Sequence, residues 1–220
     1  MAVLYQYPLQ TEFNRVVPKS KIYAHANPSE RVRDLFVSQV EQIVWSHKLA
    51  TETVNLAATR DVPEIQVFNI SLRSADFDES VLRTIDKAIP FPIIHELYYG
   101  KRVRIAAAYK RPSEAEKAKW VTDLYFQSPW MAQATVREPL PIVLNLAGLY
   151  ERLLLPLADV APRKNESLQA LVERVKTIRA RQTELKTVEQ QLRRERQFKN
   201  KVDLNGHLRG LRRELDALFN

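Results

Sequence analysis

The chain of 220 residues contains no cysteine and only four glycines. Without cysteine it can form no disulfide, thiolate metal site or thiol nucleophile, and this composition suits the reducing cytoplasm, where we expect the protein to reside. The glycines, which stand at 100, 148, 206 and 210, form neither a phosphate-binding loop nor a dinucleotide-binding fingerprint. The sequence therefore lacks the nucleotide-binding loops of an ATP-driven motor.

Metal-binding and membrane signals are missing as well. The four histidines at 25, 47, 95 and 207 include no pair four residues apart and no nearby carboxylate set, so we expect no bound metal and no other cofactor. No run approaches the roughly 18 apolar residues of a membrane span. The first ten residues lack the cationic start and apolar run of a secretory signal. We expect no membrane association.

Positive charge is concentrated near the C-terminus. Residues 163–220 hold 15 of the 34 Lys+Arg and 8 of the 26 Asp+Glu, a net charge of +7, whereas residues 1–162 carry a net charge of +1. None of the 12 prolines lies in the C-terminal segment, as a long helix requires. We therefore predict two domains, a core over residues 1–162 and a basic helical arm over residues 163–220.

Three helices are expected in the core. Asn27-Pro28-Ser29-Glu30 has the form of a capped helix start, and apolar residues at helical spacing extend the predicted helix to about Lys48. Asp78 begins a shorter helix that ends at Pro90. Pro139-Leu140-Pro141 opens a third, which we expect to be the best buried helix because apolar residues dominate it: Ile142, Leu144, Leu149, Leu153, Leu154 and Leu157.

Four strands are expected between these helices, over Glu64–Arg73, Phe91–Tyr98, Val103–Tyr109 and Trp120–Phe126. Gly100-Lys101 predicts a hairpin turn between the second and the third. In the first, apolar side chains change face, which indicates either a bulge or burial on both faces. The fold class is α+β: a small, mostly antiparallel sheet packed with helices, followed by a long, coiled-coil-like helical arm.

The arm carries two apolar series. Asn165 can cap a helix with an imperfect heptad repeat, and a regular series of leucines runs from Leu204 to Leu218. Asn200, Asp203 or the Asn205-Gly206 pair could break the helix and fold its second half back as a hairpin, although one continuous helix is also compatible with the spacing. The apolar stripe needs a partner, which is the core, the arm of a second copy or another protein.

Two carboxylates and an amide suggest a metal-dependent nuclease. Glu52 precedes Glu64-Ile65-Gln66 by 12 residues, and nucleases of the restriction-enzyme type place an acid before a strand that carries Glu-x-Lys or, occasionally, Glu-x-Gln. In that chemistry two carboxylates hold Mg²⁺ and the third group orients water. Glu41 could add a further polar group. The catalytic lysine is absent from the motif, and two exposed carboxylates at a strand edge would give the same pattern.

The basic arm offers a nucleic-acid site. Five cations lie within nine residues: Arg193, Arg194, Arg196, Lys199 and Lys201. Phosphate binding requires cations at this density, but a solvated helix face or a surface for an acidic protein would carry the same charges. A smaller basic patch, Asn14-Arg15 with Lys19 and Lys21, lies beside Phe13 and could contact nucleic acid or a partner.

Eight ordered segments resemble one prokaryotic family from about Tyr7 to Leu218. They are Phe13–Tyr23, Leu35–Val37, Gln39–Trp45, Lys48–Leu56, Pro63–Phe68, Ile85–Ile94, Ala107–Glu114 and Glu195–Asn205. The chain resembles the family known as domain of unknown function 4391. The resemblance implies an accessory protein whose genes lie beside helicases and DNA methyltransferases in restriction or anti-phage defence clusters, and it supplies no catalytic residues.

The sequence as a whole favours a non-enzymatic role. We expect an adaptor subunit that binds a helicase or methyltransferase partner, associates with itself through the arm, or does both, and that contacts DNA or RNA through the basic cluster. One alternative is a divalent-metal nuclease, the only case that requires Mg²⁺, and the other is a structural scaffold.

Overall fold

The computed structural model describes residues 3–113, 115–116 and 120–219. Glu114, which ends one of the segments above, and residues 117–119 of the loop before Trp120 lie outside the described residues. The chain divides into two compact units, Met1–Ala158 and Asp159–Asn220, each of which has its own internal packing. No helix among the described residues is both long and apolar enough to cross a membrane.

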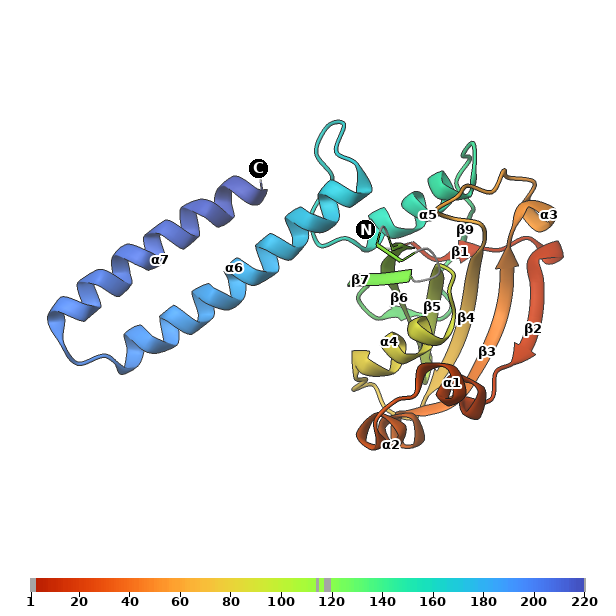
Figure 1. Cartoon of the computed structure of the whole chain (residues 1–220), viewed down its shortest axis with the longest axis horizontal. Helices are drawn as coiled ribbons and strands as arrows, with labels where there is room; N and C mark the ends of the chain where they lie inside the picture. The colour runs from red at the N-terminus through yellow and green to blue at the C-terminus, as the bar shows by residue number, and fades with distance from the viewer. Residues whose placement is uncertain (1–2, 114, 117–119, 220) are drawn as a thin grey trace. The chain divides into compact units, whose positions relative to one another are not determined.

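The first unit is built on one mixed sheet with the strand order β2-β3-β4-β5-β6-β7 (Figure 1). All neighbouring strands are antiparallel except β4 and β5, which run parallel because helix α4 connects them. The strands are β2 (Glu12–Val16), β3 (Val40–Leu49), β4 (Ile65–Leu72), β5 (Ile93–Tyr99), β6 (Arg102–Pro112) and β7 (Trp120–Gln127). The expected α+β fold with a mostly antiparallel sheet is confirmed.

Short strands complete the unit. β8 (Met131–Ala132) pairs with β6, and β1 (Tyr5–Gln6) pairs in parallel with β9 (Glu138–Pro139). The four predicted strands are all present, and the hairpin register Tyr99↔Arg102 places its turn at Gly100, whose φ of +57° suits glycine. Of the two alternatives for the first predicted strand, β4 shows burial on both faces. The β3–β4 pair also contains two register shifts, and in each of them the additional residue is in β3.

Helices α1 (Lys19–Ala26), α2 (Glu30–Gln39) and α4 (Glu79–Ala88) gather on the same side of the sheet (Figure 1). Asp78 caps α4 as predicted, with its side chain accepting a hydrogen bond from the Ser80 main-chain nitrogen. Val81, Leu82 and Ile85 of α4 are buried in the main core with residues of the sheet. The shorter helices are η1 (Leu9–Thr11), α3 (Thr51–Val54), α5 (Leu146–Leu154) and η2 (Leu155–Leu157).

The helix predicted to reach Lys48 ends at Gln39, and the second half of that segment is strand β3. Two register shifts in β3, at Val40/Gln42 and Trp45/His47, interrupt its two-residue alternation. The buried positions therefore recur every third residue, at Val40, Ile43, Ser46 and Leu49. This spacing resembles that of a helix, which explains the error.

Two predicted helix starts also differ from the structure. Asn27 is the left-handed C-cap of α1, with φ +45°, and not the cap of α2. Helix α5 begins after Asn145, whose side chain accepts a hydrogen bond from the Gly148 main-chain nitrogen. Ile142 lies outside α5 and is fully exposed, and the proline segment before α5 is not helical.

The second unit is a helical hairpin of α6 (Leu168–Arg194) and α7 (Phe198–Phe219) that runs back alongside α6 (Figure 1). The hairpin alternative is therefore correct, but the break is at residues 195–197, and Asn205-Gly206 lies inside α7. Ser167, and not Asn165, caps α6. Leu208 and Leu211 of α7 pack with Val188 of α6, so the two apolar series cover one another.

Candidate functional site

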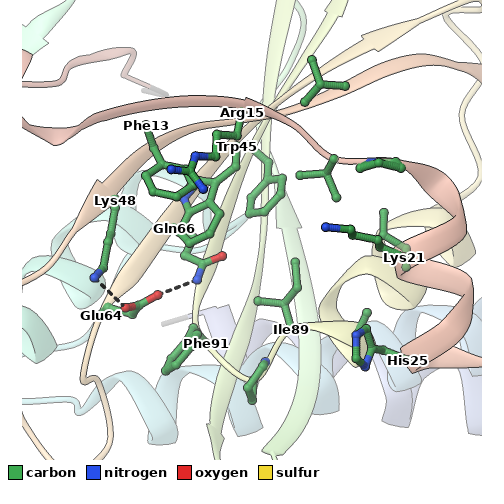
Figure 2. A pocket seen from close by; sticks show the side chains of 17 residues that line it. Phe13, Arg15, Lys21, His25, Trp45, Lys48, Glu64, Gln66, Ile89 and Phe91 are labelled. Carbon is green, nitrogen blue, oxygen red and sulfur yellow. Dashed lines mark hydrogen bonds and ion pairs between the residues drawn. The ribbon is translucent and has the colours of Figure 1, made fainter.

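The two predicted acids of the nuclease hypothesis both lie beside Lys48, and Glu64 also contacts Gln66; Figure 2 shows Lys48, Glu64 and Gln66. Lys48, near the end of β3, lies 2.6 Å from Glu52 and 3.5 Å from Glu64. Gln66 in β4 donates a hydrogen bond from its side-chain nitrogen to Glu64. The hydrogen bond between Lys48 and Glu52 raises the pKa of the lysine and lowers that of the carboxyl. The four side chains thus form a chain of contacts, with two ion pairs at Lys48 and one hydrogen bond between Gln66 and Glu64.

Glu41 does not join this cluster. It is an exposed residue near the opposite end of β3 and lines a different cavity. Among the described residues no three His, Cys, Asp or Glu side chains are grouped closely enough to hold a metal ion. Glu52 and Glu64 are the two acids that the cluster offers to a cation, and Lys48 lies beside both of them.

A pocket of about 560 Å³ opens beside Gln66. Four separate segments form it: β2 with α1, the middle of β3, the start of β4, and the loop from α4 to β5. Most of its wall is apolar, and its polar side chains are Arg15, Lys21, His25, Lys48, Glu64 and Gln66. The cavity therefore combines an apolar interior with three cationic side chains and one carboxylate, which Lys48 already pairs.

Aromatic rings form one wall of the pocket. The Phe13 and Trp45 ring centroids are 4.1 Å apart, and the Trp45 and Phe68 rings are stacked with an interplanar angle of 11°. The Arg15 guanidinium lies over the Phe13 ring, 4.5 Å from its centroid. Figure 2 shows Phe13, Trp45 and Arg15 on one side of the pocket and Lys21 on the other.

A buried ionic network holds the pocket wall at the end of α4. Lys110 and Asp86 are fully buried, and the lysine side chain donates hydrogen bonds to the main-chain oxygens of Asp86, Ile89 and Phe91. Asp86 also accepts a hydrogen bond from Tyr125 and lies 3.0 Å from His95. Because Ile89 and Phe91 line the pocket, Lys110 fixes that wall through their carbonyl groups.

Burial and charge act on this network in opposite directions. Burial raises the pKa of the Asp86 carboxyl, but Lys110 and His95 outweigh burial and hold it below its usual value. For Lys110, burial lowers the pKa of the ammonium group despite the attraction of Asp86. The pairing thus keeps a charged carboxylate in the core, where an unpaired one would be strongly destabilising.

Part of this site was visible in the sequence. The patch of Arg15 and Lys21 beside Phe13 was noted, and both cations line the pocket. The sequence gives no pocket signal at Ile89 or Phe91 and predicts Phe91 as the first residue of a strand, whereas the structure places both in the loop before β5, where Lys110 binds their carbonyl groups. The sequence does not connect Lys48 with Glu64, since the contact joins β3 to the residue just before β4.

The five predicted nucleic-acid-binding cations lie together at the tip of the helical hairpin. We define the hairpin tip as residues 193–201, which include the end of α6, the turn and the start of α7. All five cations are exposed, and none forms an ion pair among the residues that the structure describes: Arg193, Arg194, Arg196, Lys199 and Lys201.

The acid within the tip is used to hold the turn between α6 and α7. Glu195 accepts hydrogen bonds of 2.7 Å from the main-chain nitrogens of Arg196 and Gln197, and a third from the Asn200 side chain. The Gln197 main-chain N–H and the Asn200 amide hold the pKa of the Glu195 carboxyl below its usual value. Glu195 therefore stabilises the start of α7 and directly pairs none of the arginines.

The rest of the hairpin differs from the tip because several of its cations are paired. The pairs are Lys176–Glu173, Arg179–Asp159, Arg181–Glu184, Arg181–Glu214 and Arg212–Glu189. The tip thus holds a concentration of cations that the hairpin itself does not neutralise.

Comparison with known families gives one match. The family model described as Domain of unknown function (DUF4391) matches residues 6–215. The match includes the pocket residues, the buried network and the hairpin tip. Comparison with curated proteins gives no match, and comparison with solved structures gives none.

Proposed function

The chain belongs to the family described as domain of unknown function (DUF4391), and from this premise we propose that it is an accessory, non-motor subunit that binds nucleic acid through its hairpin tip. The single observation that carries the proposal is the group of five exposed cations at the tip, none of which forms an ion pair with a carboxylate in the part of the chain that the structure describes. The system it serves would be a prokaryotic anti-phage defence or restriction-like system, with a helicase or DNA methyltransferase as partner.

The tip has the chemistry of a phosphate-binding surface. Each lysine or arginine that neutralises a phosphate releases a condensed counterion, so five unpaired cations predict a logarithmic salt slope of about −4.5 on duplex DNA and about −3.5 on single strands. Arginine also offers a planar group that fits phosphate oxygens in pairs. The paired cations elsewhere in the hairpin are less available for this purpose.

An exposed aromatic ring lies among these charges. Phe198, the first residue of α7, is 82 % exposed and stands between Arg196 and Lys199 in the sequence. Aromatic rings beside cations are typical of surfaces that bind single strands, because unstacked bases pack on the ring while phosphates contact the cations. Phe198 therefore favours a single-stranded ligand over a duplex.

The matching experiment is a binding assay with labelled single- and double-stranded oligonucleotides. The charge reversals Arg193→Glu and Arg196→Glu together should abolish most of the affinity. Lys164→Glu with Lys186→Glu changes the net charge by the same amount at exposed positions outside the tip and serves as the matched control. Equal loss in both double variants, or no loss in either, would contradict a site at the tip.

The adaptor part of the proposal needs its own test. The full-length protein should co-purify with the helicase or methyltransferase encoded beside its gene when the two are expressed together, and the complex should persist in the tip variant. Failure of both candidate partners to bind, with nucleic-acid binding intact, would leave a nucleic-acid-binding protein without an adaptor role. Failure of both kinds of binding would favour the structural scaffold.

One observation supports the alternative of a divalent-metal nuclease. Lys48 on β3 lies 3.5 Å from Glu64, so under this alternative Lys48 would take the place of the lysine that the Glu64-Ile65-Gln66 motif lacks. With Mg²⁺ bound by Glu52 and Glu64, Lys48 would orient the attacking water. The test is DNA cleavage with Mg²⁺ or Mn²⁺, lost in Glu64→Ala and in Lys48→Met. Absence of cleavage with and without the partners would exclude this alternative.

A further inference from the structure

The pocket beside Gln66 has a composition that the nucleic-acid proposal for the hairpin tip does not use. We propose that this pocket in the first unit binds a nucleotide, either free or as the terminal residue of a strand. Its volume of about 560 Å³ lies within the range of small-ligand sites, which are mostly apolar and carry a few well-placed polar groups.

The walls suit a planar ring. Phe13, Trp45 and Phe68 form a packed aromatic wall, and Ile89 and Phe91 come from the loop between α4 and β5. Lys110 holds this loop by hydrogen bonds to the carbonyl oxygens of both residues. The apolar interior is therefore fixed by buried structure, so a base can enter without the protein having to order the wall first.

Gln66 supplies a hydrogen-bond acceptor inside this apolar space. Its side-chain nitrogen is occupied by Glu64, which fixes the orientation of the amide, and the residue is only 3 % exposed. Its side-chain oxygen accepts no hydrogen bond among the described residues. An acceptor on a side chain that is itself nearly buried favours a ligand with an N–H group, such as the amino or imino group of a base.

The charges at the opening suit a phosphate. Lys21 and His25 of α1 line the pocket, are exposed and make no side-chain contact with an acid among the described residues. Arg15 lies on the aromatic wall with its guanidinium over Phe13. Because Lys48 already pairs Glu64, the carboxylate does not repel an anion that approaches Lys21 and Arg15. A planar ring with N–H groups and an attached dianion is a nucleotide.

Isothermal titration calorimetry on the full chain tests this inference. The probes are the four ribonucleoside monophosphates, a 5′-phosphorylated hexanucleotide, the same hexanucleotide with a 5′-hydroxyl, adenosine, ribose 5-phosphate and octanoate. The titrations use the Arg193→Glu/Arg196→Glu protein, so that binding at the tip contributes little. Failure of the tip proposal and failure of the pocket proposal are thereby measured separately.

At least one monophosphate or the 5′-phosphorylated hexanucleotide should bind, and Lys21→Glu should weaken that binding by about tenfold or more, as expected for loss of a charge-assisted contact. Lys87→Glu, an exposed lysine of α4 outside the pocket lining, makes the same charge change and should alter binding by less than about twofold. Adenosine and ribose 5-phosphate should both bind more weakly than the monophosphate. Gln66→Leu should reduce the advantage of the monophosphate over ribose 5-phosphate.

The hexanucleotides identify the source of the nucleotide. Binding of the 5′-phosphorylated strand, with weak or no binding of monophosphates and of the 5′-hydroxyl strand, assigns the pocket to strand ends. Binding of monophosphates alone assigns it to free nucleotides. No binding of any phosphorylated probe, octanoate binding as tight as the best nucleotide, or equal affinity with and without Lys21→Glu in the Arg193→Glu/Arg196→Glu protein would overturn the inference.

Discussion

Lys110 and Asp86 form a fully buried ion pair, with the ammonium nitrogen 3.2 Å from a carboxylate oxygen. They join β6 to the last turn of α4, and the same lysine contacts the carbonyl oxygen of Phe91 at 2.8 Å. The pair therefore links the hydrophobic core to the wall of the pocket. Its two partners lie 24 residues apart in the sequence, and no local pattern connects them.

Removal of either partner should strongly destabilise the first unit. Asp86→Asn leaves a buried lysine without its carboxylate, and we expect it to cost about 3–5 kcal/mol in the free energy of unfolding. Lys110→Met should be comparably harmful. Because each single change leaves the other charge unpaired, Asp86→Asn/Lys110→Met should cost less than the sum of the two. Urea unfolding of the three variants measures this coupling, and simple additivity would contradict a functional ion pair.

The same pair predicts an acid-dependent loss of stability. The pKa of Asp86 is lower in the folded protein than its usual value, so the native state binds fewer protons than the unfolded chain. The contribution of Asp86 is complete above the unfolded pKa of about 3.9 and is lost as the pH falls below it towards the folded pKa. The free energy of unfolding, measured from pH 7 to pH 3, should therefore fall more steeply with decreasing pH in wild type than in Asp86→Asn/Lys110→Met. Parallel curves would contradict this role of Asp86.

The hairpin should depend on one buried arginine. Arg174 in α6 makes two hydrogen bonds of 2.7 Å to Glu166 and one of 2.9 Å to the Leu218 main-chain oxygen at the end of α7. Arg174→Ala should weaken the docking of α7 by about 1–3 kcal/mol, seen as faster hydrogen exchange of α7 amides. Arg179→Ala removes an exposed ion pair with Asp159. It should change the opening free energy of the α7 amides, measured by hydrogen exchange, by less than about 1 kcal/mol. Equal effects would show that Arg174 has no special role.

Two glycine substitutions should have opposite effects, because Gly206 lies inside helix α7 and Gly100 lies in the turn between β5 and β6. Gly206 lies within α7, and a methyl group there would meet no atom within 4 Å. Gly206→Ala should therefore stabilise α7 by about 0.5–1 kcal/mol. Gly100→Ala should instead destabilise the β5–β6 turn, because Gly100 has φ +57°. Thermal unfolding distinguishes the two effects, and a destabilised Gly206→Ala protein would place the turn at Asn205-Gly206.

The sequence predicted elements where local signals and tertiary packing agree. Asp78 both caps α4 and precedes its apolar face, so that helix was located correctly. In β3, by contrast, two register shifts space the buried residues three apart and produce an apparent helical pattern. In the arm, Asn205-Gly206 is a weak helix former, yet Leu204 and Leu208 pack against α6 and keep α7 continuous.

The candidate sites followed the same rule. The tip cations are adjacent in the chain and could be recognised from charge density alone. The pocket depends on contacts between distant segments, such as Lys48 with Glu64 and Lys110 with Phe91. Arg15 and Lys21 were visible as a basic patch, but the sequence did not indicate that they surround a cavity with Gln66 inside it.

The most direct test of the central claim is the salt dependence of nucleic-acid binding. Fluorescence anisotropy with a labelled single strand, measured between about 50 and 300 mM salt, should give a logarithmic slope of about −3.5 for the wild-type protein. Arg193→Glu/Arg196→Glu should lower the affinity and reduce that slope by about 1.5 or more, since two contacts are lost and two repulsive charges are added. An unchanged affinity and slope in this variant would contradict a nucleic-acid site at the hairpin tip.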